Sequence, residues 1–205
     1  LDGVEAGLRP GVQALVFHVL RWLGRAQALR QQLARRTPPP LADALLCTAL
    51  ALAWREEGAP YDAFTLVDQA VEAAKRHPDT RQQANFINAC LRRFLRERAA
   101  LVAATDSDPV ALWNHPRWWI ARLQKDHPVN WQQILQANNT HAPLTLRVNK
   151  RKVAITEYLH TLSAANIVAT QAGKSAVVLR KAMPVGAIPG FAQGLVSVQD
   201  AAAQR

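Results

Sequence analysis

The sequence is poor in the residues that disulfide frameworks and metal sites need. Its 205 residues include only two cysteines, Cys47 and Cys90, and both stand at apolar positions of helical patterns, where free thiols are usually buried. Two cysteines without clustered histidines make a poor zinc site, and the six histidines are scattered along the chain. We therefore expect two buried thiols, no disulfide and no metal.

Long apolar runs are also missing. The most apolar stretch, residues 44–54, is about half of the roughly 20 residues that a membrane-spanning helix requires. A secretory signal would begin with positive charge followed by an apolar run and a cleavage site, and none of these opens the sequence. These absences favour a cytoplasmic protein with no membrane partner.

Acidic residues are scarce relative to basic ones. Lys and Arg number 25 against 15 Asp and Glu, which gives a formal net charge of +10. A chain with this excess attracts polyanions through long-range attraction and counterion release, so nucleic acid is the leading candidate partner. Apolar residues make up 49% and charged residues 20%, which is the composition of a globular protein rather than a disordered one.

Residues 1–140 read as an all-α domain. Apolar residues recur there at helical spacing in stretches separated mainly by proline, glycine and His-Pro breaks. The predicted helices are Gly11–Arg36, Leu41–Trp54, Tyr61–Arg76, Thr80–Arg98, Pro116–Lys125 and Asn130–Asn138. The second is apolar nearly all round, which predicts that it is central.

Finer features of this domain follow from the same pattern. The third helix should bury a stripe of Phe64, Val67, Val71 and Ala74, and Asp79 or Thr80 should cap the fourth. Four tryptophans follow the fourth helix, and at their spacing they favour a packed domain junction over a base-stacking platform. These four are Trp113, Trp118, Trp119 and Trp131.

Residues 141–205 form a second, α+β domain. Short runs rich in Leu, Val and Thr predict strands, and one stretch between the first two runs is long enough for a helix. The strands are Leu144–Asn149, Ile167–Gln171, Ala176–Arg180 and Leu195–Gln199, and the helix is Val153–Ala165. This β-α-β-β-β order is compatible with a small ferredoxin-like or RRM-like unit.

Two basic groups are candidate RNA-binding sites. On the fourth helix Arg92, Arg93, Arg96 and Arg98 could contact phosphate, although such a face is commonly just solvated, and Arg92 or Arg93 could instead brace a neighbouring domain. After the first strand, the second group could line an RNA entrance, although its Arg-Asn pair could equally brace the sheet. This second group is Arg147, Asn149, Lys150, Arg151 and Lys152.

One sequence resembles a phosphate-binding loop without the required context. Gly173-Lys174-Ser175 matches the end of such a loop, but Val168 stands where its first glycine should be. A strand follows where a helix is needed. We interpret the segment as a basic hairpin turn.

Several segments carry a resemblance to a known family. Residues 85–94 (NFINACLRRF) resemble a helix of domains like the antitermination factor NusB. His115–Trp119, Trp131, 137–139 and Pro143–Asn149, followed by 188–191 and 196–204, resemble the ribosomal RNA small-subunit methyltransferase B family in order and spacing. The resemblance covers almost the whole chain and implies a NusB-like helical bundle followed by the ferredoxin-like unit.

The family resemblance implies an activity that this chain should not perform alone. Family members transfer a methyl group from S-adenosylmethionine to cytosine C5 of 16S ribosomal RNA through a cysteine nucleophile. Their catalytic Rossmann-like domain follows the segment similar to 199–204, and Cys47 and Cys90 match neither family cysteine motif. We expect no catalytic or cofactor residue here, and as partners small-subunit ribosomal RNA and the protein's own C-terminal methyltransferase domain. The alternative is a free-standing NusB-like RNA-binding or antitermination-type module.

Overall fold

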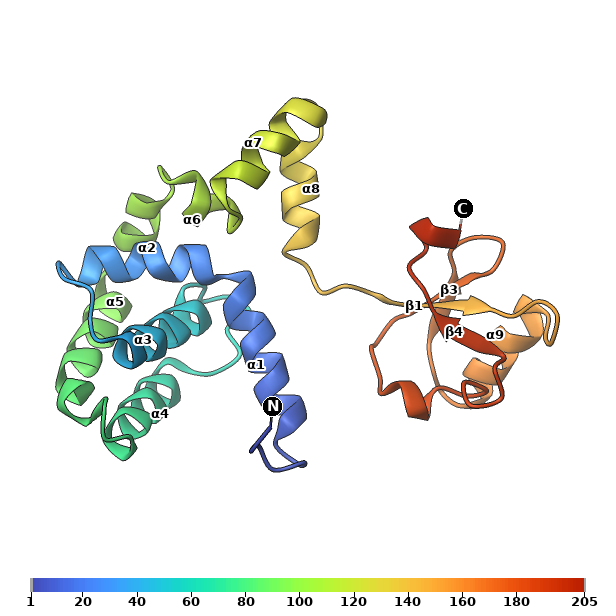
Figure 1. Cartoon of the computed structure of the whole chain (residues 1–205), viewed down its shortest axis with the longest axis horizontal. Coiled ribbons are helices and arrows are strands. Elements are labelled where there is room, and N and C mark those ends of the chain that lie inside the picture. Colours follow the sequence, from blue (N-terminus) through green and yellow to red (C-terminus); the bar gives the residue numbers. More distant parts are fainter. Residues whose placement is uncertain (1, 205) are drawn as a thin grey trace. The chain divides into compact units, whose positions relative to one another are not determined.

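The computed structural model describes residues 2–204, and the chain divides into two compact units, Leu1–Thr140 and His141–Arg205 (Figure 1). Each unit has its own hydrophobic core and is described by itself. In the described part of the chain, no helix is both long enough and apolar enough to span a membrane.

The first unit is helical throughout, as the sequence predicted. A 3-10 turn, Arg81–Gln83, precedes its fifth helix. The α-helices are α1 (Arg9–Arg21), α2 (Leu23–Leu33), α3 (Pro40–Ala53), α4 (Ala63–Arg76), α5 (Ala84–Thr105), α6 (Pro109–Trp113), α7 (Arg117–Asp126) and α8 (Trp131–Asn138). The short α6 was not predicted, because five residues are too few to show a helical period.

The prediction of one helix over Gly11–Arg36 is wrong. The helix breaks at Trp22, whose backbone (φ −115°, ψ 16°) is not helical and whose ring packs 5.0 Å from that of Trp54. Beyond the break, Gly24 brings α2 against α6, where a Cβ would lie 2.6 Å from the carbonyl oxygen of Val110. The periodicity missed the break because the apolar pattern runs on across it.

The predicted central helix is confirmed. Eight of the fourteen residues of α3 are buried, and α2, α4 and α5 pack around it. Both cysteines lie in this core as free, buried thiols.

The predicted buried stripe of α4 is displaced. Leu66, Ala70 and Ala74 are its buried residues, whereas Phe64 is 82% exposed. Ala74 of the predicted stripe is thus buried and Val67 packs partly buried against the core, while the small Ala70 and Ala74 let this side of α4 approach its neighbours. Asp62 begins the helix, where its Oδ1 accepts a 2.9 Å hydrogen bond from the amide of Thr65.

The predicted cap before α5 is absent. Neither Asp79 nor Thr80 caps the turn with its side chain; the buried Thr80 hydroxyl instead donates to the carbonyl oxygen of Ala74 at 2.8 Å. The Thr80 hydroxyl thus bonds to the C-terminal turn of α4 and does not cap the next helix.

A buried arginine ties α2 to the end of α5. Arg25 is 3% exposed, and its Nη1 donates to Thr105 Oγ1 and Asp106 Oδ1, each at 2.6 Å, and to the carbonyl oxygen of Val102 at 3.2 Å. The backbone amide of Arg25 donates to Asn114 Oδ1 at 2.8 Å. Side chain and backbone together fix the position of α2.

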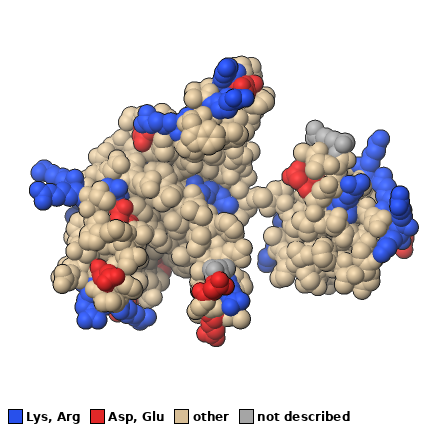
Figure 2. All heavy atoms as spheres, viewed as in Figure 1, with Lys and Arg blue, Asp and Glu red and all other residues tan. Residues whose placement is uncertain are grey.

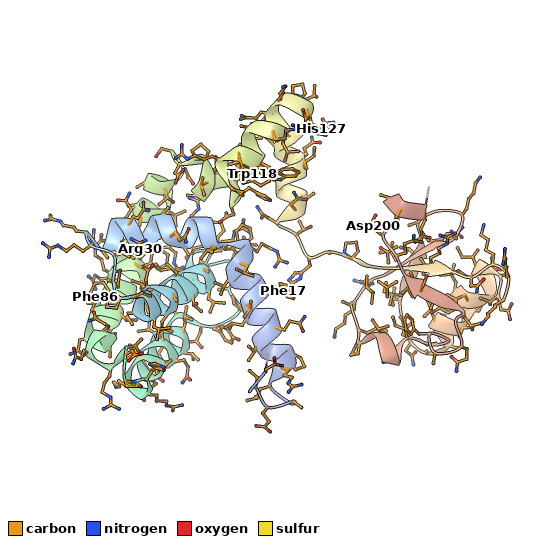
Figure 3. All side chains as sticks on the ribbon, viewed as in Figure 1. Phe17, Arg30, Phe86, Trp118, His127 and Asp200 are labelled. Carbon is orange, nitrogen blue, oxygen red and sulfur yellow. The ribbon has the colours of Figure 1, made fainter. Side chains whose placement is uncertain are left out.

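The helices α7 and α8 enclose a small core of their own. Ile120, Leu123 and Leu135 are buried there. Of the four tryptophans, Trp113, Trp119 and Trp131 pack against this core, as the packing interpretation predicted. Trp118 on α7 is 68% exposed, so for this residue the interpretation is wrong (Figure 3).

The second unit is a four-stranded antiparallel sheet with one helix. Its elements are β1 (Leu144–Val148), α9 (Ile155–Ala164), β2 (Ala169–Gln171), β3 (Ala176–Leu179), the 3-10 turn Val185–Ala187, β4 (Val196–Val198) and the 3-10 turn Ala202–Gln204. The strand order is β2-β3-β1-β4. This arrangement confirms the ferredoxin-like prediction, with a 3-10 turn where a second long helix would join β3 to β4.

The two faces of the sheet differ because side chains alternate along a strand. Leu146 and Val148 of β1 are buried in a core with Tyr158 and Leu162 of α9. Arg147, between them in the sequence, therefore points from the other face, where it pairs across the sheet with Ser197. The strand pattern thus places Arg147 on the face opposite α9.

Candidate nucleic-acid interface

The four arginines predicted on the fourth helix all lie on α5 but do not form one surface. Arg92, Arg93 and Arg96 are exposed, and their spacings of three and four place them along one side of the helix. The side chain of Arg98 is 19% exposed; its Nη1 lies 3.2 Å from Glu56 Oε2 and its guanidinium 5.9 Å from the centre of the Phe94 ring. Arg98 therefore braces the helical unit.

The three exposed arginines differ in how their charge is compensated. Arg93 Nε lies 3.0 Å from Glu97 Oε2, and Arg92 Nε donates to Asn88 Oδ1 at 3.1 Å. Arg96 makes no ion pair or side-chain hydrogen bond within residues 2–204. Its charge is thus the least compensated on this side of α5.

The second basic group lies at a groove where β1 ends. Arg147, Lys150 and Arg151 line a groove of about 820 Å³, together with Ser175, Gly194, Gln199 and other residues, none of them acidic. Figure 2 shows Lys and Arg side chains gathered along one edge of this unit. A basic groove without acidic lining suits a phosphate backbone, because nothing in its wall repels the ligand's charge.

Two members of this group hold the groove's shape. Asn149 Nδ2 donates to the carbonyl oxygen of Gly194 at 3.2 Å, and Asn149 Oδ1 accepts from the amide of Arg151 at 3.2 Å. Lys152 Nζ donates to the carbonyl oxygen of Gln193 at 2.6 Å. These contacts join the turn after β1 to the turn before β4, so Asn149 and Lys152 position the cations beside them.

Strand pairing brings further residues to the groove that the sequence reasoning did not single out. The hairpin turn between β2 and β3 places Ser175 beside β1. Its carbonyl oxygen accepts a 2.8 Å hydrogen bond from the backbone amide of Val148. Gln199 Oε1 accepts from Arg147 Nη1 at 3.2 Å. The hairpin interpretation of 173–175 is confirmed, but its position beside β1 depends on the β1–β3 register.

The thiols are unsuited to nucleophilic chemistry. Burial, aided by the nearby Asp43 carboxylate, raises the pKa of Cys47 to about 11, and burial also raises the pKa of Cys90. Both stay protonated near neutral pH, and the thiolate is the reactive form. Over the part of the chain that the structure covers, no three His, Cys, Asp or Glu side chains gather as metal ligands.

Comparisons with known proteins match both units. The NusB family model matches residues 4–96, and the model "Methyltr_RsmF/B-like, ferredoxin-like domain" matches residues 115–186. The second match begins at the α6–α7 junction, so it includes α7 and α8 as well as most of the sheet unit.

Two curated relatives match over the whole chain. Ribosomal RNA small subunit methyltransferase B of Pseudomonas putida is 36% identical over 207 residues, covering 100% of this chain and 47% of the relative. The Vibrio cholerae protein of the same name is 34% identical and covers 100% of this chain and 48% of its own length. The chain thus spans about half the length of these relatives.

A solved structure shares the fold at low sequence identity. The crystal structure of PH0851 superimposes with a TM-score of 0.66 and 16% identity, over 98% of this chain and 46% of that one. The two family models match in the order in which the two domain types occur along the chain, and the relatives match over the whole of this chain. The chain therefore belongs to the ribosomal RNA small subunit methyltransferase B family, of which it carries the NusB-like and ferredoxin-like region.

Proposed function

We propose that this chain is the RNA-binding region of an S-adenosylmethionine-dependent enzyme that methylates C5 of a cytosine in small-subunit (16S) ribosomal RNA. It holds the RNA so that the target base reaches the methyltransferase domain of the same cytoplasmic protein. The basic groove at the end of β1 carries the proposal, because it combines cations with an absence of acidic lining. Residues 141–205 contain 8 Lys and Arg against 2 Asp and Glu, so this small unit is strongly basic.

The methyl donor does not fit the residues present here. A Rossmann-type cofactor site needs a glycine-rich turn between a strand and the following helix, and the turn from β1 to α9 (149–154) contains no glycine. The buried, protonated thiols offer no nucleophile for cytosine C6. We therefore assign cofactor binding and catalysis to a separate domain, and RNA binding without methyl transfer to this chain.

The proposal is tested by binding and chemistry in parallel. The 205-residue chain should bind a small-subunit rRNA hairpin with a Kd on the order of 10⁻⁶ M or weaker that rises steeply with salt. It should incorporate no radiolabelled methyl group from S-adenosylmethionine. The double variant Lys150→Glu/Arg151→Glu should weaken binding about tenfold or more and reduce the salt slope. Methyl incorporation above a no-protein control would contradict the proposal.

A matched control separates the groove from general charge. Arg180 and Lys181 are exposed neighbours in the same unit that do not line the groove. The double variant Arg180→Glu/Lys181→Glu changes net charge equally, so it should weaken RNA binding by less than half as much in free energy. Equal losses for the two variants would show that only net charge matters and would remove the groove from the proposal.

A free-standing NusB-type module is the second candidate, favoured by the match of the NusB model to residues 4–96. Two observations argue against this candidate. An antitermination-type domain does not need the ferredoxin-like unit, and the relatives are about twice as long as this chain. The gene sequence beyond residue 205 distinguishes the two. A glycine-rich loop followed by Pro-Cys and Thr-Cys motifs supports the methyltransferase, and a stop codon supports the module.

A further inference from the structure

The surface between α4 and α5 holds an aromatic ring that the helical core does not use. Phe64, in the first turn of α4, is 82% exposed, although it belongs to an amphipathic helix whose other side is packed. Exposing a large aromatic side chain forgoes the stabilisation that its burial would contribute. The ring stands at a groove of about 460 Å³.

A cation shares this groove with the ring. Arg92 of α5 lines it together with Phe64, while Val67, Val71 and Leu95 form its apolar wall. Arg92 Nε donates to Asn88 Oδ1 at 3.1 Å, which anchors the guanidinium one helical turn from its partner. No other hydrogen bond or ion pair engages Arg92 within residues 2–204, so its terminal Nη groups are open to an incoming acceptor.

We infer that this groove is a subsite for single-stranded RNA, in which an unpaired base stacks on Phe64 while a neighbouring phosphate binds Arg92. The inference rests on the proposed function and names the form of RNA that the helical unit takes. Aromatic rings stack on any base, and the planar guanidinium matches phosphate geometry. RNA-binding proteins recognise unstacked loops and ends largely in this way.

Charge favours RNA over an apolar protein segment as the occupant. Arg93 and Arg96 extend the basic side of α5 next to Arg92, and Asp68 is the single acidic residue in the groove's described lining. A protein segment that needed only the apolar wall would gain nothing from this row of cations. A polyanion gains a phosphate contact for each one.

The experiment uses the 205-residue chain and two labelled probes, an oligoadenylate about 12 nucleotides long and an abasic ribose-phosphate oligomer of the same length. Wild type should prefer the oligoadenylate. Phe64→Ala should lower affinity for the oligoadenylate about 5- to 150-fold, leave the abasic probe unaffected and preserve the salt slope. Arg92→Gln should weaken both probes and reduce the slope by about 0.7.

Further variants separate stacking from simple apolar contact. Phe64→Trp should retain the affinity, whereas Phe64→Leu should lose nearly as much as Phe64→Ala, because leucine is apolar but does not stack. Phe17→Ala removes another exposed phenylalanine (54%, on α1) and should have no effect. Since Phe64 is so exposed, circular dichroism should show that its variants remain folded.

The outcomes distinguish this inference from the proposed function. If wild type binds the rRNA hairpin but Phe64→Ala binds oligoadenylate as wild type does, the stacking subsite is overturned and the proposed function stands. Wild-type behaviour of Phe64→Leu would also overturn it, because an apolar side chain without a ring would then be sufficient for binding. If wild type binds no RNA of any kind, both ideas fail together.

Discussion

Arginine serves different purposes in the two units of this protein. In the helical unit, Arg25 is buried and Arg30 and Arg98 are largely buried, each facing a carboxylate: Asp106 at 2.6 Å, Asp43 at 2.8 Å and Glu56 at 3.2 Å. In the ferredoxin-like unit, Arg147, Lys150 and Arg151 are exposed around a groove without acidic lining. These three arginines of the helical unit are thus structural, while the three cations that line the groove of the smaller unit are available to a ligand.

The largest effect should come from removing the most buried cation. Arg25→Ala should lower the free energy of unfolding of the helical unit by about 2–4 kcal/mol, because three acceptors lose their donor and a cavity remains. Asp106 is 51% exposed and can be solvated, so the loss stays below that of a fully buried pair. Urea unfolding measures it, with Gln27→Ala on the exposed side of α2 as control. A loss below about 0.5 kcal/mol would contradict the structural role.

Alkaline pH should destabilise the helical unit through its buried thiols, because both cysteines lie in its core. The folded pKa of Cys47 is about 11 and the ordinary thiol value is 9.0, so the folded state keeps its proton longer than the unfolded state. Its contribution is fully present below pH 9 and is lost as pH rises from about 9 to 11. We expect a loss of about 1 kcal/mol between pH 9 and 10. Urea unfolding at these two pH values checks it, and Cys47→Ala should flatten the dependence.

The smallest effect concerns the exposed arginines of α5. Arg96→Gln should weaken binding to a small-subunit rRNA fragment about two- to fivefold and reduce its salt slope by about 0.7–0.9. Arg93→Gln should do less, because Glu97 already compensates Arg93. Fluorescence anisotropy across a salt series measures both. An equal loss for the two variants would show that the ion pair does not lower the availability of Arg93.

The sequence predicted most elements but not how they face each other. The apolar run of Leu41–Trp54 led to a central helix, and short runs rich in Leu, Val and Thr led to four strands, because both signals lie among neighbours in the sequence. The break at Trp22 was missed because the apolar pattern continues across it. The burial of Phe64 was misjudged, since helical period does not say which of two apolar faces packs. The position of α4 depends instead on the close approach that Ala70 and Ala74 allow.

The candidate site divides in the same way. The basic runs are visible in the sequence, and so is the turn at 149–152 that carries three of the groove's residues. The sequence did not show that Ser175 and Gln199 would join them, because their place depends on the pairing of β1 with β3 and β4. Nor did it show that Arg98 would be held by Glu56, which lies 42 positions earlier in the chain.

By itself, the sequence determined the two-part organisation, the fold classes and the excess of positive charge, because each is set by composition or by patterns among near neighbours. Only the tertiary structure decided which cations are available to a ligand and which are bound by carboxylates. An arginine's role depends on what residues distant in sequence place around it. The same residue type is therefore a buried brace at Arg25 and a groove-lining cation at Arg147.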